Sequence, residues 1–312
     1  MISVVFGGGQ VGSPLARILV EKGHEVRVVK RSPGGIPSGA QLVAGDAADL
    51  KFCIAAVEGA DAVYHCMNPP YSVKVWADLL PRYMANLIEA SARAGARLVA
   101  LDNVYMLGKP NGKRLADDTP MNPCSRKGEI RATAAQMLFD AHRRGNIRAT
   151  AGRASDFYGP GGRLTLLGDY FWPRVFNGRS GQILMNPDVP HTHHYIPDVA
   201  AGLATLGGAP DDVFGKPWML PCRPPETFRE LVRRLERPFG ASIRLTVVPG
   251  WIQRAVSVFM PVLRETREMA YQWDEPFVID DSRFRDRFGV VPEDADCAAA
   301  ATVAWARAQY AK

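Results

Sequence analysis

The chain has 312 residues, 47% of them apolar, which is enough to bury the core of one large domain or of two lobes. Its 38 basic and 32 acidic residues give a net charge of +6 without a block of consecutive Lys or Arg, which disfavours a nucleic-acid-binding protein. Five scattered cysteines without a CxxC pair favour a reducing cytoplasm over a disulfide framework or a zinc knuckle, and no apolar run reaches the roughly 18 residues of a membrane span.

The N-terminal stretch predicts a strand, a glycine turn and a helix in immediate succession. The run "ISVVF" is short, apolar and β-branched, as in a buried parallel strand, and it carries no export signal. Gly7, Gly9 and Gly12 then match the spacing G-x-G-x-x-G. Ser13 is expected to cap the helix, and Gly23 is expected to end it before the next strand, "HEVRVV".

A glycine turn between a strand and a helix is typical of dinucleotide binding. The first glycine permits the tight turn, the second lets the backbone approach a pyrophosphate, and the third allows the helix to pack closely on the sheet. Free N–H groups at the start of the helix attract the phosphate charge. The sequence therefore predicts cofactor contacts from Gly7, Gly9, Gln10, Val11 and Gly12. The alternative is a tightly packed turn that binds nothing.

The end of the second strand bears on the choice between NAD and NADP. NAD-preferring proteins usually carry an acidic residue there, which holds the ribose 2′-hydroxyl. Here the strand ends in Lys30, Arg31 and Ser32, two cations and a hydroxyl that suit a 2′-phosphate. We therefore expect NADP as the cofactor, with NAD as the second choice. An ordinary solvated strand end is the alternative.

The alternation of strands and helices continues to about residue 105. "AQLVAGDAAD", "DAVYHCM" and "RLVALDNVY" read as the third, fourth and fifth strands, with a helix through Ala56 after the third and one from about Trp76 to Ala94 after the fourth. Repeated units of this length predict a doubly wound parallel sheet with its ligand at the carboxyl ends of the strands. Those ends carry Gly9, Arg31, Asp46, Cys66 to Asn68, and Asp102.

With these elements, the chain resembles the extended short-chain dehydrogenase/reductase superfamily, in its NAD-dependent epimerase/dehydratase branch and among the atypical members. The resemblance covers nearly the whole chain and runs through "GGGQVG", "GDAAD", "DNVYMLG", "KGEIR", "RASDFYGPGG" and "HYIPDVAAGLATL". It implies a Rossmann-type region over residues 1–150. Residues 151–312 would form mainly a smaller substrate-binding lobe, with segments that return to the Rossmann core.

The resemblance also implies cofactor contacts beyond the glycine turn. Asp46 and Ala47 would contact the adenine, Met67 and Asn68 would flank the ribose, and residues 155–160 would lie beside the nicotinamide. A homodimer built on the helices near 79–94 and 127–144 is a further expectation from the family.

The chain departs from the family at the catalytic residues. The family uses a helical Tyr-x-x-x-Lys pair, whose side chains share one face of the helix and carry out proton transfer. Aligned on its glycine, "KGEIR" puts Lys127 in the tyrosine position and Arg131 in the lysine position, and the accessory Ser/Thr position falls on Leu101.

A literal Tyr-x-x-x-Lys match occurs at Tyr105 and Lys109. Gly108 and Pro110 disfavour a helix there, so the two side chains would not share a face. Tyr105 nevertheless stays a candidate for lining the site and, by analogy, for acid catalysis.

Lys127 is the main catalytic candidate. Burial beside Arg131 would favour its neutral amine, so that Lys127 could exchange a proton with a carbonyl oxygen or stabilise an oxyanion beside the cofactor. Arg131 stays charged and could clamp ribose, phosphate or a substrate carboxylate. Asp102, at a strand end, is the next acid–base candidate. The alternatives are a solvated helix face for Lys127 and Arg131, and a turn contact for Asp102.

After about residue 150 the periodicity is lost, and the Gly- and Pro-rich segment suggests a substrate lobe. Candidate pocket residues are Arg153, Asp156, Tyr158, Arg163 and Trp172, with packing in the lobe as the alternative for each. "HTHH" at residues 191–194 lacks further ligands at metal spacing, so we expect no metal site. His194 is expected to pack under the lobe or to reach the cofactor edge.

An amphipathic segment, "WIQRAVSVFMPVL", follows the strand "SIRLTVV". Its apolar stripe consists of Trp251, Ile252, Val256, Phe259 and Met260. We expect this stripe to be part of the core. A cap over an apolar substrate and a contact with a membrane surface are the alternatives.

Three functions are compatible with these residues. The first is an NAD(P)-dependent oxidoreductase or epimerase that acts on a small carbonyl or hydroxyl substrate with Lys127 in place of tyrosine. The second keeps the fold but catalyses non-redox elimination, isomerisation or cyclisation. The third is a non-catalytic redox sensor that responds to NADP.

Overall fold

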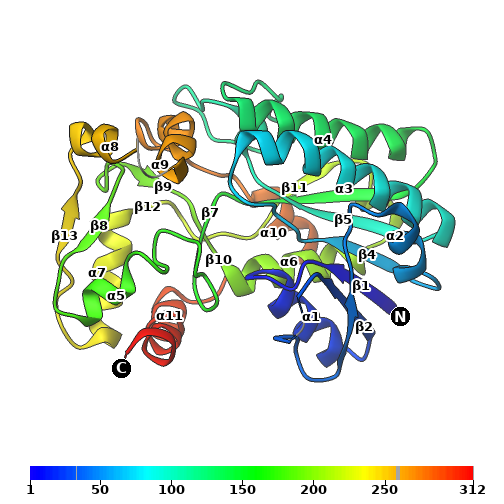
Figure 1. Ribbon diagram of the computed structural model, residues 1–312, viewed down its shortest axis with the longest axis horizontal. Helices are drawn as coiled ribbons and strands as arrows, with labels where there is room; N and C mark the ends of the chain where they lie inside the picture. The colour runs from blue at the N-terminus through cyan, green and yellow to red at the C-terminus, as the bar shows by residue number, and fades with distance from the viewer. Residues whose placement is uncertain (33, 258–260, 312) are drawn as a thin grey trace.

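The computed structural model describes residues 1–32, 34–257 and 261–311, and within them a seven-stranded sheet forms the centre of an α/β fold (Figure 1). The strands lie in the order β11-β6-β5-β4-β1-β2-β3, and each neighbouring pair is parallel. They are β1 (Ile2–Phe6), β2 (Glu25–Lys30), β3 (Ala40–Ala44), β4 (Ala62–His65), β5 (Arg97–Asp102), β6 (Arg148–Arg153) and β11 (Pro217–Met219). The strand order reverses between β1 and β4, so the predicted doubly wound Rossmann-type sheet is confirmed.

Helices cover both faces of this sheet (Figure 1). Helices α1 (Gly12–Glu21) and α6 (Ile196–Gly207) pack together on one face, where Leu15 and Leu203 are fully or almost fully buried. Helices α2 (Leu50–Ala56), α3 (Val73–Ala94) and α4 (Arg126–Arg143) cover the other face, where Leu87 and Leu138 belong to the core. The near-continuous apolar strands are therefore buried on both sides, as in other parallel sheets.

The second half of the chain contributes both to the sheet and to a separate lobe. Strand β11 pairs with β6, and α10 (Ser282–Phe288) packs beside β11. The lobe contains α5 (Trp172–Phe176), α7 (Phe228–Phe239) and α11 (Ala295–Tyr310). Its short strand pairs are β7 (Asp156–Tyr158) with β10 (His193–Tyr195), β8 (Gly181–Ile183) with β13 (Leu245–Val247), and β9 (Pro190–His191) with β12 (Glu226–Thr227). The remaining elements are α8 (Gly250–Ser257), α9 (Pro261–Thr266), and the 3₁₀ helices η1 (Tyr105–Leu107), η2 (Asp211–Val213) and η3 (Arg267–Trp273).

The first helix begins two residues earlier than a cap at Ser13 implies. Val11 stands at the N-cap position, and the hydroxyl of Ser13 donates a hydrogen bond to the carbonyl of Gly8, 2.9 Å away. The expectation that Ser13 caps the helix was therefore wrong, because its side chain closes the glycine turn instead. Helix α3 likewise begins at Val73, about one turn before Trp76.

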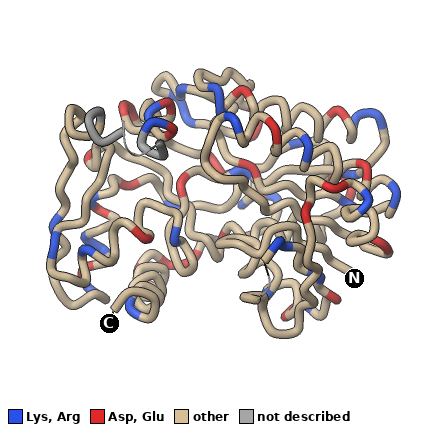
Figure 2. Tube along the Cα trace, in the orientation of Figure 1, with Lys and Arg blue, Asp and Glu red and all other residues tan. Residues whose placement is uncertain are grey.

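The apolar segment near residue 251 does not behave as a simple piece of core. The side chain of Trp251 is 70% exposed, and that of Ile252 is partly buried. Val256, Phe259 and Met260 lie outside the residues whose side chains the structure describes. No helix among the described residues is long and apolar enough to cross a membrane. Basic and acidic segments are scattered over the trace and are separated by longer uncharged stretches (Figure 2).

Candidate functional site

The glycine turn leaves open space at its centre. Gly7 has a φ of +102°, and a Cβ on it would lie 2.8 Å from the carbonyl oxygen of Cys66. A Cβ on Gly12 would overlap the carbonyl oxygen of Gly7, so both positions need glycine for packing. Around Gly9, by contrast, a Cβ would meet no described atom within 4 Å. Gly9 is therefore where the backbone can be approached from outside.

An unsatisfied polar atom marks the same turn. Within the described chain, the buried Oε1 of Gln10 has no hydrogen-bond partner. Buried polar atoms normally have partners in protein or water, so this oxygen indicates a ligand or water contact. The open backbone at Gly9 and the free acceptor of Gln10 together fit a dinucleotide pyrophosphate and its ribose at the start of α1.

The ends of β2 and β3 carry further predicted cofactor contacts. Arg31 and Ser32 are exposed, whereas the ammonium of Lys30 donates to the carbonyl of Gly34 at 2.7 Å. The carboxylate of Asp46 accepts from the backbone N–H of Ala48 at 2.9 Å. The carbonyl of buried Ala47 accepts from the side chain of Asn86 at 2.8 Å. Of the two cations Lys30 and Arg31, Arg31 is therefore the one whose exposed side chain makes no hydrogen bond or ion pair with the described residues.

Arg131 lies between two other predicted site residues, Asn68 and Asp102. Its guanidinium donates to the side-chain oxygen of Asn68 at 2.7 Å and lies 3.4 Å from the carboxylate of Asp102. It also lies over the ring of Trp76, 4.8 Å from its centroid. Burial raises the pKa of Asp102, although the charges of Arg131 and Arg153 oppose this shift. Arg131 therefore links β5, α3 and α4 at the carboxyl edge of the sheet, while Met67 lies partly buried beside Asn68.

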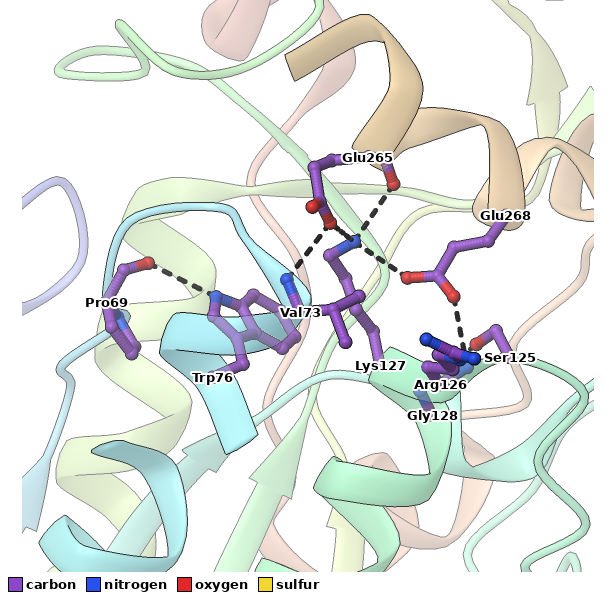
Figure 3. Close-up of polar contacts among 9 residues, drawn as sticks. All are labelled: Pro69, Val73, Trp76, Ser125, Arg126, Lys127, Gly128, Glu265 and Glu268. Carbon is purple, nitrogen blue, oxygen red and sulfur yellow. Dashed lines mark hydrogen bonds and ion pairs between the residues drawn. The ribbon is translucent and has the colours of Figure 1, made fainter. Parts of the chain in front are cut away.

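Lys127 is fully buried and held by two glutamates (Figure 3). Its Nζ donates to the carbonyl oxygen of Glu265 at 3.0 Å, to Glu265 Oε2 at 2.5 Å and to Glu268 Oε1 at 2.7 Å. It also lies 4.5 Å from the centroid of the Tyr71 ring. An ammonium group has three N–H donors, so all three are used by acceptors within the protein. The alternative of a solvated helix face is wrong for Lys127 and for Arg131, which is 7% exposed.

The two glutamates also bind the starts of two helices. Glu265 accepts from the backbone N–H of Val73 at 3.0 Å, and Glu268 accepts from the backbone N–H of Arg126 at 3.0 Å. Burial opposes ionisation of Glu265, but the hydrogen bonds from Lys127 and Val73 lower its pKa overall. We call Lys127, Glu265 and Glu268 the lysine clasp. It joins α3 and α4 to the α9–η3 segment over the predicted catalytic position (Figure 3).

Tyr105 lies close to the lysine clasp but outside a catalytic helix. It opens the three-residue η1, which ends before Lys109, so the literal Tyr-x-x-x-Lys match has no common helical face. Its ring stacks on Trp76 with centroids 6.2 Å apart. Burial raises the pKa of Tyr105 to about 12, and the charge of Asp156 contributes. Burial and a hydrogen bond with Tyr105 raise the pKa of Tyr71 as well.

Two histidines that sequence reasoning considered only as metal ligands face Asp156. Nε2 of His191 lies 2.8 Å from the Asp156 carboxylate, without the alignment of a hydrogen bond, and its ring stacks on Trp273 at 3.8 Å. In the described residues, no ring nitrogen of His191 or His193 has a hydrogen-bond partner, although both side chains are buried. Burial lowers the pKa of His193 to about 3. A metal cluster of three or more ligands is absent from this part of the chain.

Arg153 and His194 are two further predicted site residues whose surroundings the structure describes. Arg153 is buried opposite Asp102 in the β5–β6 pair and so belongs to the Arg131 region. His194 accepts from the backbone N–H of Ser155 at 3.2 Å and contacts the carbonyl of Leu220 at 3.2 Å, so it packs under the lobe instead of reaching a ligand.

Three predicted pocket residues lie away from this region. Tyr158 and Trp172 belong to the core of the lobe, and the side chain of Trp172 has no exposed surface. Arg163 is exposed and pairs with Asp169 at 3.0 Å. These contacts fit the alternative of packing in the lobe for Tyr158 and Trp172 and a local ion pair for Arg163, while their pocket role stays a prediction.

Glu265 and Glu268 are the residues of this site that sequence reasoning missed. Their signal is present in "RETRE", because two glutamates three positions apart share one side of a helical turn. A buried lysine needs such counter-charges, but nothing in the spacing of 138 residues between Lys127 and Glu265 points to the pairing.

Comparisons with known proteins agree with this architecture. A model of the NAD dependent epimerase/dehydratase family matches residues 3–215. A curated relative, 3-diazoavenalumate denitrifying reductase from a Streptomyces species, is 29% identical over 124 residues, which is 36% of this chain and 41% of the relative. The 3 beta-hydroxysteroid dehydrogenase/Delta 5→4-isomerase of Mycobacterium tuberculosis is 39% identical over 66 residues, or 20% of this chain and 18% of the relative. The matches span less than half the length of these relatives.

Solved structures show the same fold along the whole chain. UDP-glucuronic acid 4-epimerase from Bacillus cereus, in complex with UDP-glucuronic acid and NAD, superposes with a TM-score of 0.81 at 16% identity, over 99% of this chain and 100% of the other. The dTDP-glucose 4,6-dehydratase of Streptomyces venezuelae, with NAD bound, gives 0.80 at 18% identity, over 100% and 99% of the two chains.

Proposed function

Because the chain belongs to the NAD dependent epimerase/dehydratase family, we propose that it is an NAD(P)-dependent oxidoreductase or epimerase that acts on a small carbonyl or hydroxyl substrate. The observation that carries this proposal is the glycine turn between β1 and α1, which is open at Gly9 and holds an unpartnered acceptor at Gln10. When bound, the nicotinamide would supply or accept a hydride.

The cofactor is proposed to lie along the carboxyl edge of the sheet. Gly7 to Gly12 would hold the pyrophosphate, Asp46 and Ala47 the adenine, and Met67 and Asn68 the ribose. Arg31 would bind a 2′-phosphate, since its exposed guanidinium can form a planar pair of hydrogen bonds. Lys30 contributes less to this preference, because its ammonium already binds the carbonyl of Gly34.

Lys127 is proposed to act on the substrate oxygen from within the lysine clasp. With all three protons bound to Glu265 and Glu268, it can serve a substrate only if a substrate oxygen replaces one of these acceptors. The exchanged ammonium proton would then stabilise the developing charge on that oxygen. Arg131 would keep Asn68 and Asp102 in place beside the cofactor ribose.

The closed lysine clasp favours one alternative, a non-catalytic sensor of NADP. In this reading the catalytic position is occupied by a structural ion pair, and cofactor binding changes a surface for a partner protein. The two functions differ in whether a substrate can open the clasp.

A carbonyl-substrate screen with NADPH tests the proposal. The purified protein is titrated with NADPH and NADH by nicotinamide fluorescence and then assayed for NADPH consumption and for product. Product formed in step with NADPH oxidation supports an oxidoreductase, and product without net oxidation supports an epimerase or a non-redox reaction. Binding without turnover supports the sensor. Failure to bind either nucleotide contradicts all of these cofactor-dependent functions.

A further inference from the structure

A groove at the outer end of the lobe is lined by arginines. It lies between the loop that follows α5, one face of α7 and the start of β13, and it encloses about 730 Å³. This volume is within the range of small-molecule sites. Strands β8 and β13 stand at one end of the molecule and β1 and α1 toward the other, so the groove is separate from the glycine turn (Figure 1).

The groove carries a concentrated positive charge. Its five arginines are Arg174, Arg179, Arg229, Arg233 and Arg244, against one acidic lining residue, Glu236. Among the described residues, only Arg229 of the five pairs with a carboxylate, that of Asp188 at 2.6 Å. The net charge of the whole chain is only +6, so the groove concentrates positive charge in one place. These like charges repel one another unless an anion binds between them.

Several contacts hold the basic groove in place. The Nε of Arg174 donates to the carbonyl of Ser180 at 3.0 Å, which leaves the outer end of its guanidinium for other partners. The carboxylate of Glu236 accepts from the backbone N–H of Ile243 at 2.8 Å, so it is turned toward the backbone. Arg229, Arg233 and Glu236 share one face of α7 with Val232, because they are three or four positions apart.

The groove also has an apolar floor and two hydroxyl groups. Val232 and Ile243 are buried and Leu245 is partly buried beneath the arginines. The hydroxyls of Thr246 and Ser180 lie 2.8 Å apart at the rim. Guanidinium groups bind phosphate oxygens in pairs, hydroxyl groups add single hydrogen bonds, and an apolar floor suits a planar base or ring.

We propose that this groove binds a small molecule with two or more adjacent phosphate groups, of the class of nucleoside diphosphates, triphosphates or inorganic polyphosphate. The site does not depend on the proposed reaction, and it would give the lobe a second anionic ligand apart from any cofactor at the glycine turn.

Calorimetric titration with inorganic triphosphate tests the site at physiological ionic strength. Arg179 and Arg233 are exposed, so Arg179→Ala/Arg233→Ala should fold normally and weaken binding about tenfold or more, as loss of charge-assisted hydrogen bonds does. Arg17→Ala is the matched control, since Arg17 is also an exposed arginine, lies on α1 and pairs with Glu21, and should leave binding unchanged. A parallel titration with ADP distinguishes a nucleotide from polyphosphate: tighter binding of ADP, lost in the same variant, assigns the apolar floor to a base.

Each remaining outcome contradicts the proposal. These are a dissociation constant for both probes above about 1 mM, equal affinity in the groove variant and wild type, or loss of binding in Arg31→Ala instead of the groove variant. Binding of single-stranded RNA but not of triphosphate would replace the small ligand with a nucleic acid and overturn it as well.

Discussion

Removing both carboxylates of the lysine clasp should destabilise the protein far more than loss of a surface ion pair. The side chain of Lys127 has no exposed surface, whereas those of Glu265 and Glu268 are 19% and 24% exposed. Glu265→Gln/Glu268→Gln therefore leaves a buried ammonium without a counter-charge, which costs about 3–5 kcal/mol. Glu268→Gln alone keeps one carboxylate and should cost about 1.5–3 kcal/mol, the contribution of one charged hydrogen bond.

A further change tests the physical reason. Lys127→Met in the Glu265→Gln/Glu268→Gln background removes the unpaired ammonium and keeps most of its volume, so much of the lost stability should return. The measurement is the free energy of unfolding in urea for each variant of the cycle. Asp78→Asn is the control, because the Arg82–Asp78 pair is about half exposed and should change stability by less than about 1 kcal/mol.

Two results would refute this reasoning. One is a loss below about 1 kcal/mol in the double glutamine variant, which would mean that water or another group pairs with Lys127. The other is no recovery with Lys127→Met, which would mean that the glutamates act through Val73 and Arg126 alone. The pH dependence adds a check: the pKa of Glu265 is lowered from 4.5, so its stabilisation is present above pH 4.5 and is lost as the pH falls through the lower folded value.

Substitutions in the glycine turn, at the end of β2 and in the lobe core have further expected outcomes. Gly12→Ala should abolish NADPH binding and lower the melting temperature, because its Cβ would overlap the carbonyl of Gly7, whereas Gly9→Ala should weaken NADPH binding with little change in melting temperature. Arg31→Ala should weaken NADPH binding about tenfold without affecting NADH, and Lys30→Ala should have a smaller effect, both by fluorescence titration. Trp172→Ala should cost about 3–5 kcal/mol in urea unfolding and leave the NADPH affinity of the folded protein unchanged, contrary to a role in the site.

The fold could be predicted because its signals are local. The apolar run before Gly7, the glycine spacing and the repeated strand–helix alternation each depend on neighbouring residues, and they led to the correct parallel sheet. The start of α1 was misplaced by two residues because the Ser13 hydroxyl bonds back to the turn, a choice that propensity does not decide.

The site could be predicted only for residues that the strand–helix pattern of the sequence places at or beside the ends of strands. Arg131, Asn68 and Asp102 meet as their positions at the carboxyl edge suggest. The partners of Lys127 could not be predicted, because Glu265 and Glu268 come from a distant segment whose docking depends on tertiary packing. All three residues of β10 are buried. Alternation along "HTHH" therefore points neighbouring side chains to opposite faces of the strand, but neither face is exposed to solvent.

Binding of a nicotinamide dinucleotide at the β1–α1 turn can be measured by hydrogen–deuterium exchange with and without NADPH. We expect slower exchange of the amides in residues 8–13 and beside Arg31, Asp46 and Asn68 when NADPH is present. Unchanged exchange in the glycine turn at saturating NADPH would contradict it, whatever activity the protein shows.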